Sequence, residues 1–179
     1  MRWQRRSIPQ AGFTLVEVLT AASLIGVVSV IAASNFRAQI PAFRTRGAAL
    51  LIAGDINQAR LSAVKDGRQY FYVPDTGTKY RIDRADGLGG VVTVKTVDVA
   101  AEFPQVTFAT SALNDPYGGA GPTAVPAGAM IFQSTGTVTN PAGVYVQAMM
   151  GGGDVSEHAV TVTAAGRVRI WRFDGSDWS

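Results

Sequence analysis

Three patterns of apolar and polar residues follow one another along the chain. From Gly12 to Phe36 most residues are apolar, and Glu17 is the only charged one. From Ala42 to Asp66 apolar residues recur every three to four positions, the period of a helix with one buried face. From Gln69 onward the period becomes two in a series of short segments, which indicates β-strands. The pattern predicts one long helix followed by a β-rich region, an α+β fold.

The apolar run is long enough to cross a bilayer. As a helix, residues 13–36 would extend about 36 Å at about 1.5 Å per residue. A carboxylate inside hydrocarbon costs about 3 kcal/mol or more, so Glu17 needs a partner there and is a candidate functional residue. The alternative is a solvated Glu17 near the helix end.

The β-rich region is divided by turn residues. Lys65, Asp66 and Gly67 end the helix, with a cation in the last turn and glycine at the cap. The stretch 114–128, rich in glycine and proline, is expected to be a long surface loop, either a plain connector or a recognition loop. One antiparallel sheet or two small ones are expected from strands over residues 69–73, 79–83, 91–97, 106–110, 130–133, 143–149, 158–164 and 167–173.

A motif stands at the start of the apolar run. A leader with Arg2, Arg5 and Arg6 precedes Gly12-Phe13-Thr14-Leu15-Val16-Glu17. This resembles the class III signal of type IV pilins and type II secretion pseudopilins. The resemblance implies a prepilin that a membrane-embedded prepilin peptidase cleaves after Gly12 and then N-methylates at Phe13. It also implies that Glu17 is the assembly carboxylate.

The chemistry of that segment agrees with the implied role. Cleavage creates an α-amine at Phe13, and Glu17 of one subunit can pair with the Phe13 amine of its neighbour. Either charge left alone in hydrocarbon is costly, so docking at the correct axial step relieves both. An ordinary secretory signal is the alternative, with cleavage after Ile31-Ala32-Ala33.

Segments of the β-rich region carry a second resemblance. In this order they resemble the GspH/FimT-like pseudopilin domain: residues 131–136, 144–146, 160–163 and Gly166-Arg167-Val168-Arg169. The resemblance implies a pilin-like fold, in which a long N-terminal helix, transmembrane in its N-terminal half, packs on an antiparallel β-sheet head. The expected parts are a leader (1–12), a transmembrane and assembly half of the helix (13–36), an amphipathic half (37–66) and the head (67–179).

The two resemblances imply a minor pilin of a type IV pilus, priming or tip-proximal. A GspH-like minor pseudopilin of a type II secretion system and a DNA-binding minor pilin in DNA uptake are the alternatives. The implied partners are other minor and major pilins or pseudopilins, the prepilin peptidase and the inner-membrane assembly platform. The implied location is the bacterial inner membrane, crossed once, with the head in the periplasm.

Composition removes several classes of site. The chain has no cysteine and one histidine, so thiol nucleophiles, disulfides and multi-histidine metal centres are excluded. His158 lies beside Glu157 in a strand pattern and is expected to be structural. No catalytic constellation, metal or cofactor is expected. The formal net charge of +3 equals the three arginines of residues 1–12, so the remainder is not a generally basic domain.

One cluster in the head remains a candidate for binding. In a strand, Arg167, Arg169 and Trp171 would project from one face, since side chains alternate along a strand. Two guanidiniums beside an indole suit phosphate binding and base stacking. A solvated strand face or contact with a neighbouring subunit is the alternative. Near the C-terminus, Phe173 and Trp178 are expected to pack on the head's own sheet, with contact to a second subunit as the alternative.

Overall fold

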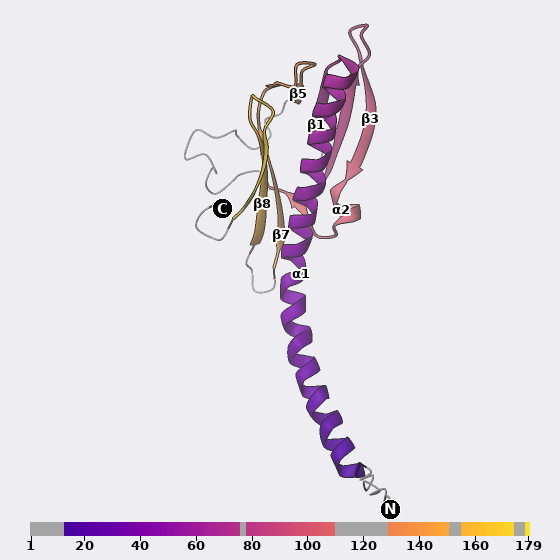
Figure 1. The fold of residues 1–179 in the computed structure, drawn as a ribbon, viewed down its shortest axis with the longest axis vertical. Coiled ribbons are helices and arrows are strands. Elements are labelled where there is room, and N and C mark those ends of the chain that lie inside the picture. Colours follow the sequence, from indigo (N-terminus) through magenta and orange to yellow (C-terminus); the bar gives the residue numbers. More distant parts are fainter. Residues whose placement is uncertain (1–12, 76–77, 110–128, 151–154, 174–177) are drawn as a thin grey trace, which may run out of the picture. The chain divides into compact units, whose positions relative to one another are not determined.

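The computed structural model describes residues 13–75, 78–109, 129–150, 155–173 and 178–179. The expected leader 1–12, with the expected cleavage position Gly12, and the expected loop 114–128 therefore lie outside the described residues. The fold class is α+β, as predicted: helix α1 (Leu15–Asp66) precedes two antiparallel sheets (Figure 1). The chain forms two compact units, Met1–Ala38 and Gln39–Ser179, which are described separately.

The first unit contains the start of α1. The backbone N–H of Glu17 donates to the Thr14 hydroxyl over 3.2 Å, the bond that an N-cap threonine makes three residues into a helix. Further along, the hydroxyls of Thr20, Ser23 and Ser29 donate to carbonyls four residues earlier. These bonds satisfy polar side chains inside an apolar helix.

In the second unit, α1 buries one face made largely of small residues. Ile52 and Ile56 are fully buried on it, and the other buried residues of this face are Thr45, Ala48, Ala49, Ala53, Ala59 and Ala63. Val64, next to Ala63 in sequence, is half exposed, because it lies beside the buried face rather than on it. Pro41 lies inside the helix, which continues through it. The helix ends as predicted: Gly67 has φ +64° and the Arg68 N–H bonds the Ala63 carbonyl, a Schellman cap.

In the described part of the chain, five strands form the first sheet, in the order β3-β2-β1-β5-β6. Their bounds are Tyr70–Pro74 (β1), Lys79–Ala85 (β2), Val91–Asp98 (β3), Met130–Phe132 (β5) and Val138–Thr139 (β6). The short helix α2 (Val99–Glu102) follows β3, and Asp98 caps it by accepting from the Ala100 N–H. Neither β6 nor α2 was predicted, because two and four residues are too few to show a period.

The second sheet has four strands among the residues that the structure describes, in the order β4-β7-β8-β9. Their bounds are Thr107–Phe108 (β4), Gly143–Met149 (β7), Val155–Val162 (β8) and Val168–Arg172 (β9). The alternative with two sheets is therefore the observed one. Compared with the prediction, β4 is shorter and β8 begins three residues earlier and ends two earlier.

The core joins α1 to both sheets. Its largest fully buried side chains include Tyr72, Tyr80 and Phe132, and the two tyrosine rings stack with centroids 4.9 Å apart. A second cluster covers the other face of the β7–β8–β9 sheet, where Tyr145 and Trp178 are buried. Trp178 contacts Tyr145 and Phe173, so the predicted packing of these C-terminal aromatics on the chain's own sheet is confirmed.

Candidate functional site

The N-terminal part of α1 exposes an apolar surface to its surroundings. Leu15–Ala33 has a mean hydropathy of 2.3, none of it is buried, and it is long and apolar enough to cross a membrane. Phe13 is 84% exposed at its start. An apolar surface of this extent is typical of contact with lipid or with another protein.

Glu17 lies in the first turn of that helix and its side chain is exposed. Ion pairs within the described residues involve other carboxylates, those of Asp55, Asp83 and Asp98. Thr14, which caps the helix beneath Glu17, was not singled out from the sequence. Its signal was nonetheless present, because threonine followed three residues later by glutamate is the capping-box pattern.

Of the predicted cluster of Arg167, Arg169 and Trp171, the structure brings Arg169 and Trp171 into contact. Arg169 is exposed on β9, and its guanidinium carbon lies 5.6 Å from the centroid of the Trp171 ring, within cation–π range. The indole Nε1 donates to the Thr161 hydroxyl over 2.8 Å, which fixes the ring on the sheet. Arg167 is exposed but precedes β9, so the predicted start of the strand was one residue early. Hydrogen bonds between Thr163 and Arg167 close the turn at that point.

The glycine before Arg167 has a structural reason that the sequence did not show. Gly166 has φ +78°, and a Cβ added there would meet the Gly136 carbonyl oxygen at 2.5 Å and the Arg60 guanidinium. Arg60, on α1, donates to that same carbonyl over 2.8 Å and to the Ala165 carbonyl over 3.4 Å. One helix side chain therefore ties a turn of each sheet together, at sequence distances too long for pattern reasoning.

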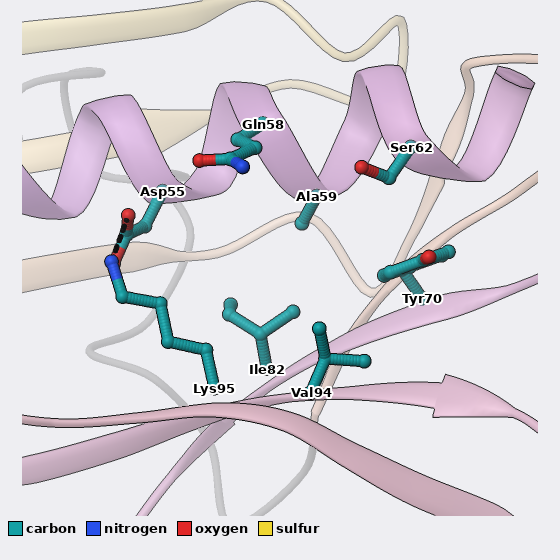
Figure 2. Close-up of a pocket in the computed structure, with 8 residues that line it drawn as sticks. All are labelled: Asp55, Gln58, Ala59, Ser62, Tyr70, Ile82, Val94 and Lys95. Carbon is teal, nitrogen blue, oxygen red and sulfur yellow. Dashed lines mark hydrogen bonds and ion pairs between the residues drawn. The ribbon is translucent and has the colours of Figure 1, made fainter.

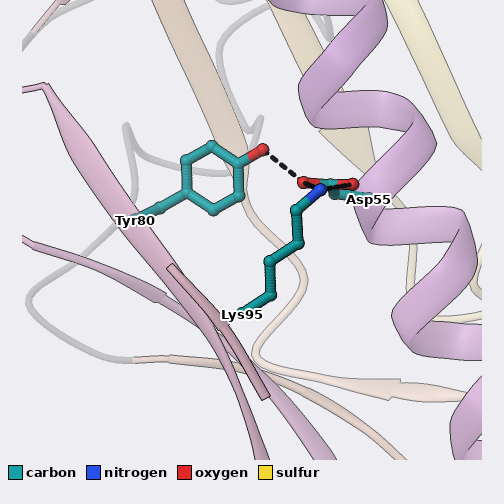
Figure 3. A network of polar contacts seen from close by, with 3 residues as sticks. All are labelled: Asp55, Tyr80 and Lys95. Atoms are coloured by element: carbon teal, nitrogen blue, oxygen red, sulfur yellow. Dashed lines mark hydrogen bonds and ion pairs between the residues drawn. The ribbon is translucent and has the colours of Figure 1, made fainter. Parts of the chain in front are cut away.

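A polar network connects α1 to β2 and β3 (Figure 3). Asp55 is buried, and it accepts a 2.6 Å bond from the Tyr80 hydroxyl. The Lys95 ammonium donates to both carboxylate oxygens of Asp55, over 2.7 and 2.8 Å. Burial, and then the hydrogen bond to Asp55, raise the pKa of Tyr80 far above its usual value, so the phenol stays a donor.

Beside this network lies a small pocket between α1 and the β2–β3 strands (Figure 2). Its apolar surface comes from Ala59, Tyr70, Ile82 and Val94. Asp55, Gln58, Ser62 and Lys95 supply its polar groups. Its empty volume is about 320 Å³, a value that includes space open to solvent.

His158 and Glu157 are both buried on β8. Burial, followed by the charges of Arg172 and Arg46, lowers the pKa of His158, and burial raises the pKa of Glu157. His158 Nδ1 and Glu157 Oε1 each lack a hydrogen-bond partner within the described residues. The described part of the chain also holds no cluster of histidines and carboxylates able to bind a metal. This arrangement offers no nucleophile–base pair.

Comparison with known proteins identifies the N-terminal segment. Residues 9–33 match the family model described as the prokaryotic N-terminal methylation motif. The chain carries a prepilin motif. That matched range includes Gly12, Phe13 and Glu17 and extends through the exposed apolar helix.

A solved structure is similar to this chain over most of its length. It is the minor pseudopilin EpsH from the type 2 secretion system of Vibrio cholerae, 12% identical, with a TM-score of 0.49. The match covers 71% of this chain and 95% of that one. No curated protein matches the sequence.

Proposed function

We propose that this chain is a minor pilin of a type IV pilus, a structural subunit rather than an enzyme, anchored in the bacterial inner membrane with its head in the periplasm. The observation that carries the proposal is the methylation motif at residues 9–33, joined to an apolar helix whose surface is exposed. A priming or tip-proximal position follows from the GspH/FimT-like resemblance of the β-rich region.

The mechanism is assembly. Prepilin peptidase removes residues 1–12 and methylates the new amine of Phe13. In the filament, the Glu17 carboxylate of one subunit pairs with the Phe13 amine of the next. The exposed apolar helix packs against equivalent helices of other pilins, and the inner-membrane platform adds the subunit. Glu17 suits this role because it is exposed and has no ion-pair partner within the described residues.

Mass spectrometry of the N-terminus of the mature protein tests the proposal. We expect a chain that begins at N-methylated Phe13, and an uncleaved chain when Gly12 is replaced in Gly12→Val. A mature protein that begins at Ser34 would identify an ordinary signal peptide and overturn the assignment.

The choice between the pilus and a type II secretion pseudopilus needs a cellular measurement. A deletion strain should lose pilus-dependent motility and keep exoprotein secretion. The reverse result would assign the chain to the secretion system as a GspH-like pseudopilin, with the same anchor and the same processing.

DNA binding is a second candidate because Arg169 lies over the Trp171 ring, next to exposed Arg167. Arginine stacked on an aromatic ring beside a second cation suits a nucleic-acid backbone and its bases. The purified full-length protein should bind DNA in a salt-dependent manner, and Arg167→Ala/Arg169→Ala should remove the binding. A wild-type protein that shows no salt-dependent binding would exclude this candidate.

A further inference from the structure

Among the described residues the two sheets have four edge strands, and these strands are not equally protected from pairing with another chain. Strands β4 and β6 have two residues each, and β9 has five residues, among them Arg169 and Arg172. Strand β3 has eight residues, and within the described residues it pairs only with β2. Short or charged edges resist pairing with another chain, whereas a long apolar edge invites it.

The charged side chains of β3 are engaged by the chain itself. The Lys95 ammonium binds both oxygens of Asp55 on α1, and Asp98 caps α2. What the strand exposes is mainly β-branched: Val91, Val92 and Val94 are each about half exposed, and Thr93 and Thr96 are exposed as well. Lysine commonly blunts an edge strand, but here Lys95 is held by the helix.

The pocket lies next to this edge. The pairing of β2 with β3 shifts between Ile82 and Asp83, which leaves Val94 as an extra residue in the ladder. Figure 2 shows Val94 and Lys95 on the strand facing Ala59, Ser62 and Asp55 on α1. An extended chain added to β3 would therefore run beside the pocket and could place a side chain in it.

We propose that an extended segment of a neighbouring filament subunit adds to the outer edge of β3 and inserts one uncharged, apolar side chain into the pocket between β3 and α1. The backbone of the segment would pair with β3, and the pocket would select the side chain, the usual division in recognition by strand addition. The charged residues that line the pocket, Asp55 and Lys95, form an ion pair with each other. The pocket therefore offers no unpaired charge to the entering side chain, which suits an apolar one. The inference rests on the proposed function only for the identity of the partner.

Photo-crosslinking in native membranes tests the contact directly. A benzophenone amino acid at Thr96, an exposed position on β3, should give an adduct with another prepilin-type subunit, identified by mass spectrometry. The same probe at Met149, which is 72% exposed at the end of β7, is the matched control and should not give that adduct. Absence of the adduct, an adduct within one chain or an adduct between two copies of this chain would overturn the proposal.

Charge variants test what the edge contributes to assembly. Val92→Lys/Thr96→Lys should lower incorporation into filaments about tenfold, because lysines blunt the edge. Leu88→Lys/Met149→Lys adds the same charge at exposed positions outside strand β3, in the turn before it and at the end of β7, and should assemble normally. Ser62→Leu should fill the pocket and lower incorporation, whereas Ser62→Ala should not. Thermal unfolding of each variant separates loss of the contact from loss of the fold.

The outcomes distinguish this inference from the proposed function. Normal incorporation of Val92→Lys/Thr96→Lys would overturn the edge contact and leave the pilin assignment intact. A wild-type protein absent from filaments would overturn the pilin assignment, while the adduct at Thr96 with a prepilin-type subunit would still support the edge contact.

Discussion

Some of the residues of the candidate sites could be predicted from the sequence, and others could not. Glu17 could be found because one charge in an apolar run is conspicuous, and Arg169 and Trp171 because strand alternation puts them on one face. Asp55, Tyr80 and Lys95 could not, since nothing local marks residues that meet across α1, β2 and β3. Arg60 and Gly166 also meet only after two turns have come together.

Glu157 carries the prediction that belongs to this scale. Its buried carboxyl has a pKa raised above the usual value of 4.5, and one of its oxygens lacks a partner within the described residues. As pH rises above about 4.5 the unfolded chain ionises before the folded one, so the wild type loses stability until the raised folded pKa is passed. Glu157→Gln removes this loss.

We therefore expect Glu157→Gln to unfold a few degrees higher than the wild type at pH 7, with the difference closing as pH falls toward about 4.5. Thermal unfolding followed by circular dichroism at a series of pH values measures it. The contribution of His158 is common to both proteins and cancels in the difference. An equal or lower melting temperature for the variant at neutral pH would show that the carboxylate is satisfied.

Among the elements, those with a sustained period were predicted and the short ones were not. The C-terminal part of α1 and strand β7 were located from periodicity and turn residues, and β7 has the predicted bounds. Strand β6 and helix α2 are held by contacts with their neighbours, so no local pattern marks them. The division into two sheets depends on which strands pair, which the sequence left open.

The two hairpin turns joined by Arg60 give a prediction at this scale. Gly166→Ala should cost about 2 kcal/mol of unfolding free energy, because it combines a positive φ with a Cβ that meets the Gly136 carbonyl. Gly54→Ala on α1 is the control, since nothing lies within 4 Å of its added Cβ, and it should stabilise the protein by about 0.5 kcal/mol. Denaturant unfolding measures both, and equal stability of the two variants would contradict the strain at Gly166.

The ion pair between Asp55 on α1 and Lys95 on β3 gives a second prediction at the scale of the elements. Asp55→Asn should lower the unfolding free energy by about 2 kcal/mol, because the buried acceptor loses its charge while Tyr80 and Lys95 keep their donors. Lys95→Met should cost less, since the lysine side chain is 46% exposed. Hydrogen exchange should show faster opening of β3 in Asp55→Asn. Unchanged exchange of the β3 amides would show that the hydrogen bonds of Asp55 do not stabilise this strand.

At the scale of the whole molecule, two compact units carry different parts of the proposed function. Met1–Ala38 holds the prepilin motif and the apolar helix, and Gln39–Ser179 holds the core and both sheets. The sequence was most informative about the first unit, because an apolar helix and a methylation motif are both formed by contiguous residues. The edge of β3 and its pocket depend on tertiary contacts and became visible only in the structure.

Glu17 gives the prediction for this scale. Glu17→Ala should be processed and inserted like the wild type but should be absent from sheared filaments, because the neighbour's Phe13 amine then has no carboxylate. Glu17→Asp, which keeps the charge on a shorter side chain, should restore part of the incorporation. Immunoblots of membranes and filaments measure both, and wild-type levels of Glu17→Ala in filaments would exclude the ion pair from assembly.

The hydroxyl side chains of the apolar helix donate hydrogen bonds to carbonyls of the same helix. This affects how accurately one subunit would be positioned along another in a filament. Between Leu15 and Ala33 the polar side chains are Glu17 and three hydroxyl residues, and each hydroxyl is occupied by its own helix. Apolar packing alone tolerates sliding of one helix along another. Information about axial position would then reside in a single carboxylate, and a subunit displaced by one turn would leave that charge unneutralised. Placement errors would be rejected within the membrane, before the head makes any contact.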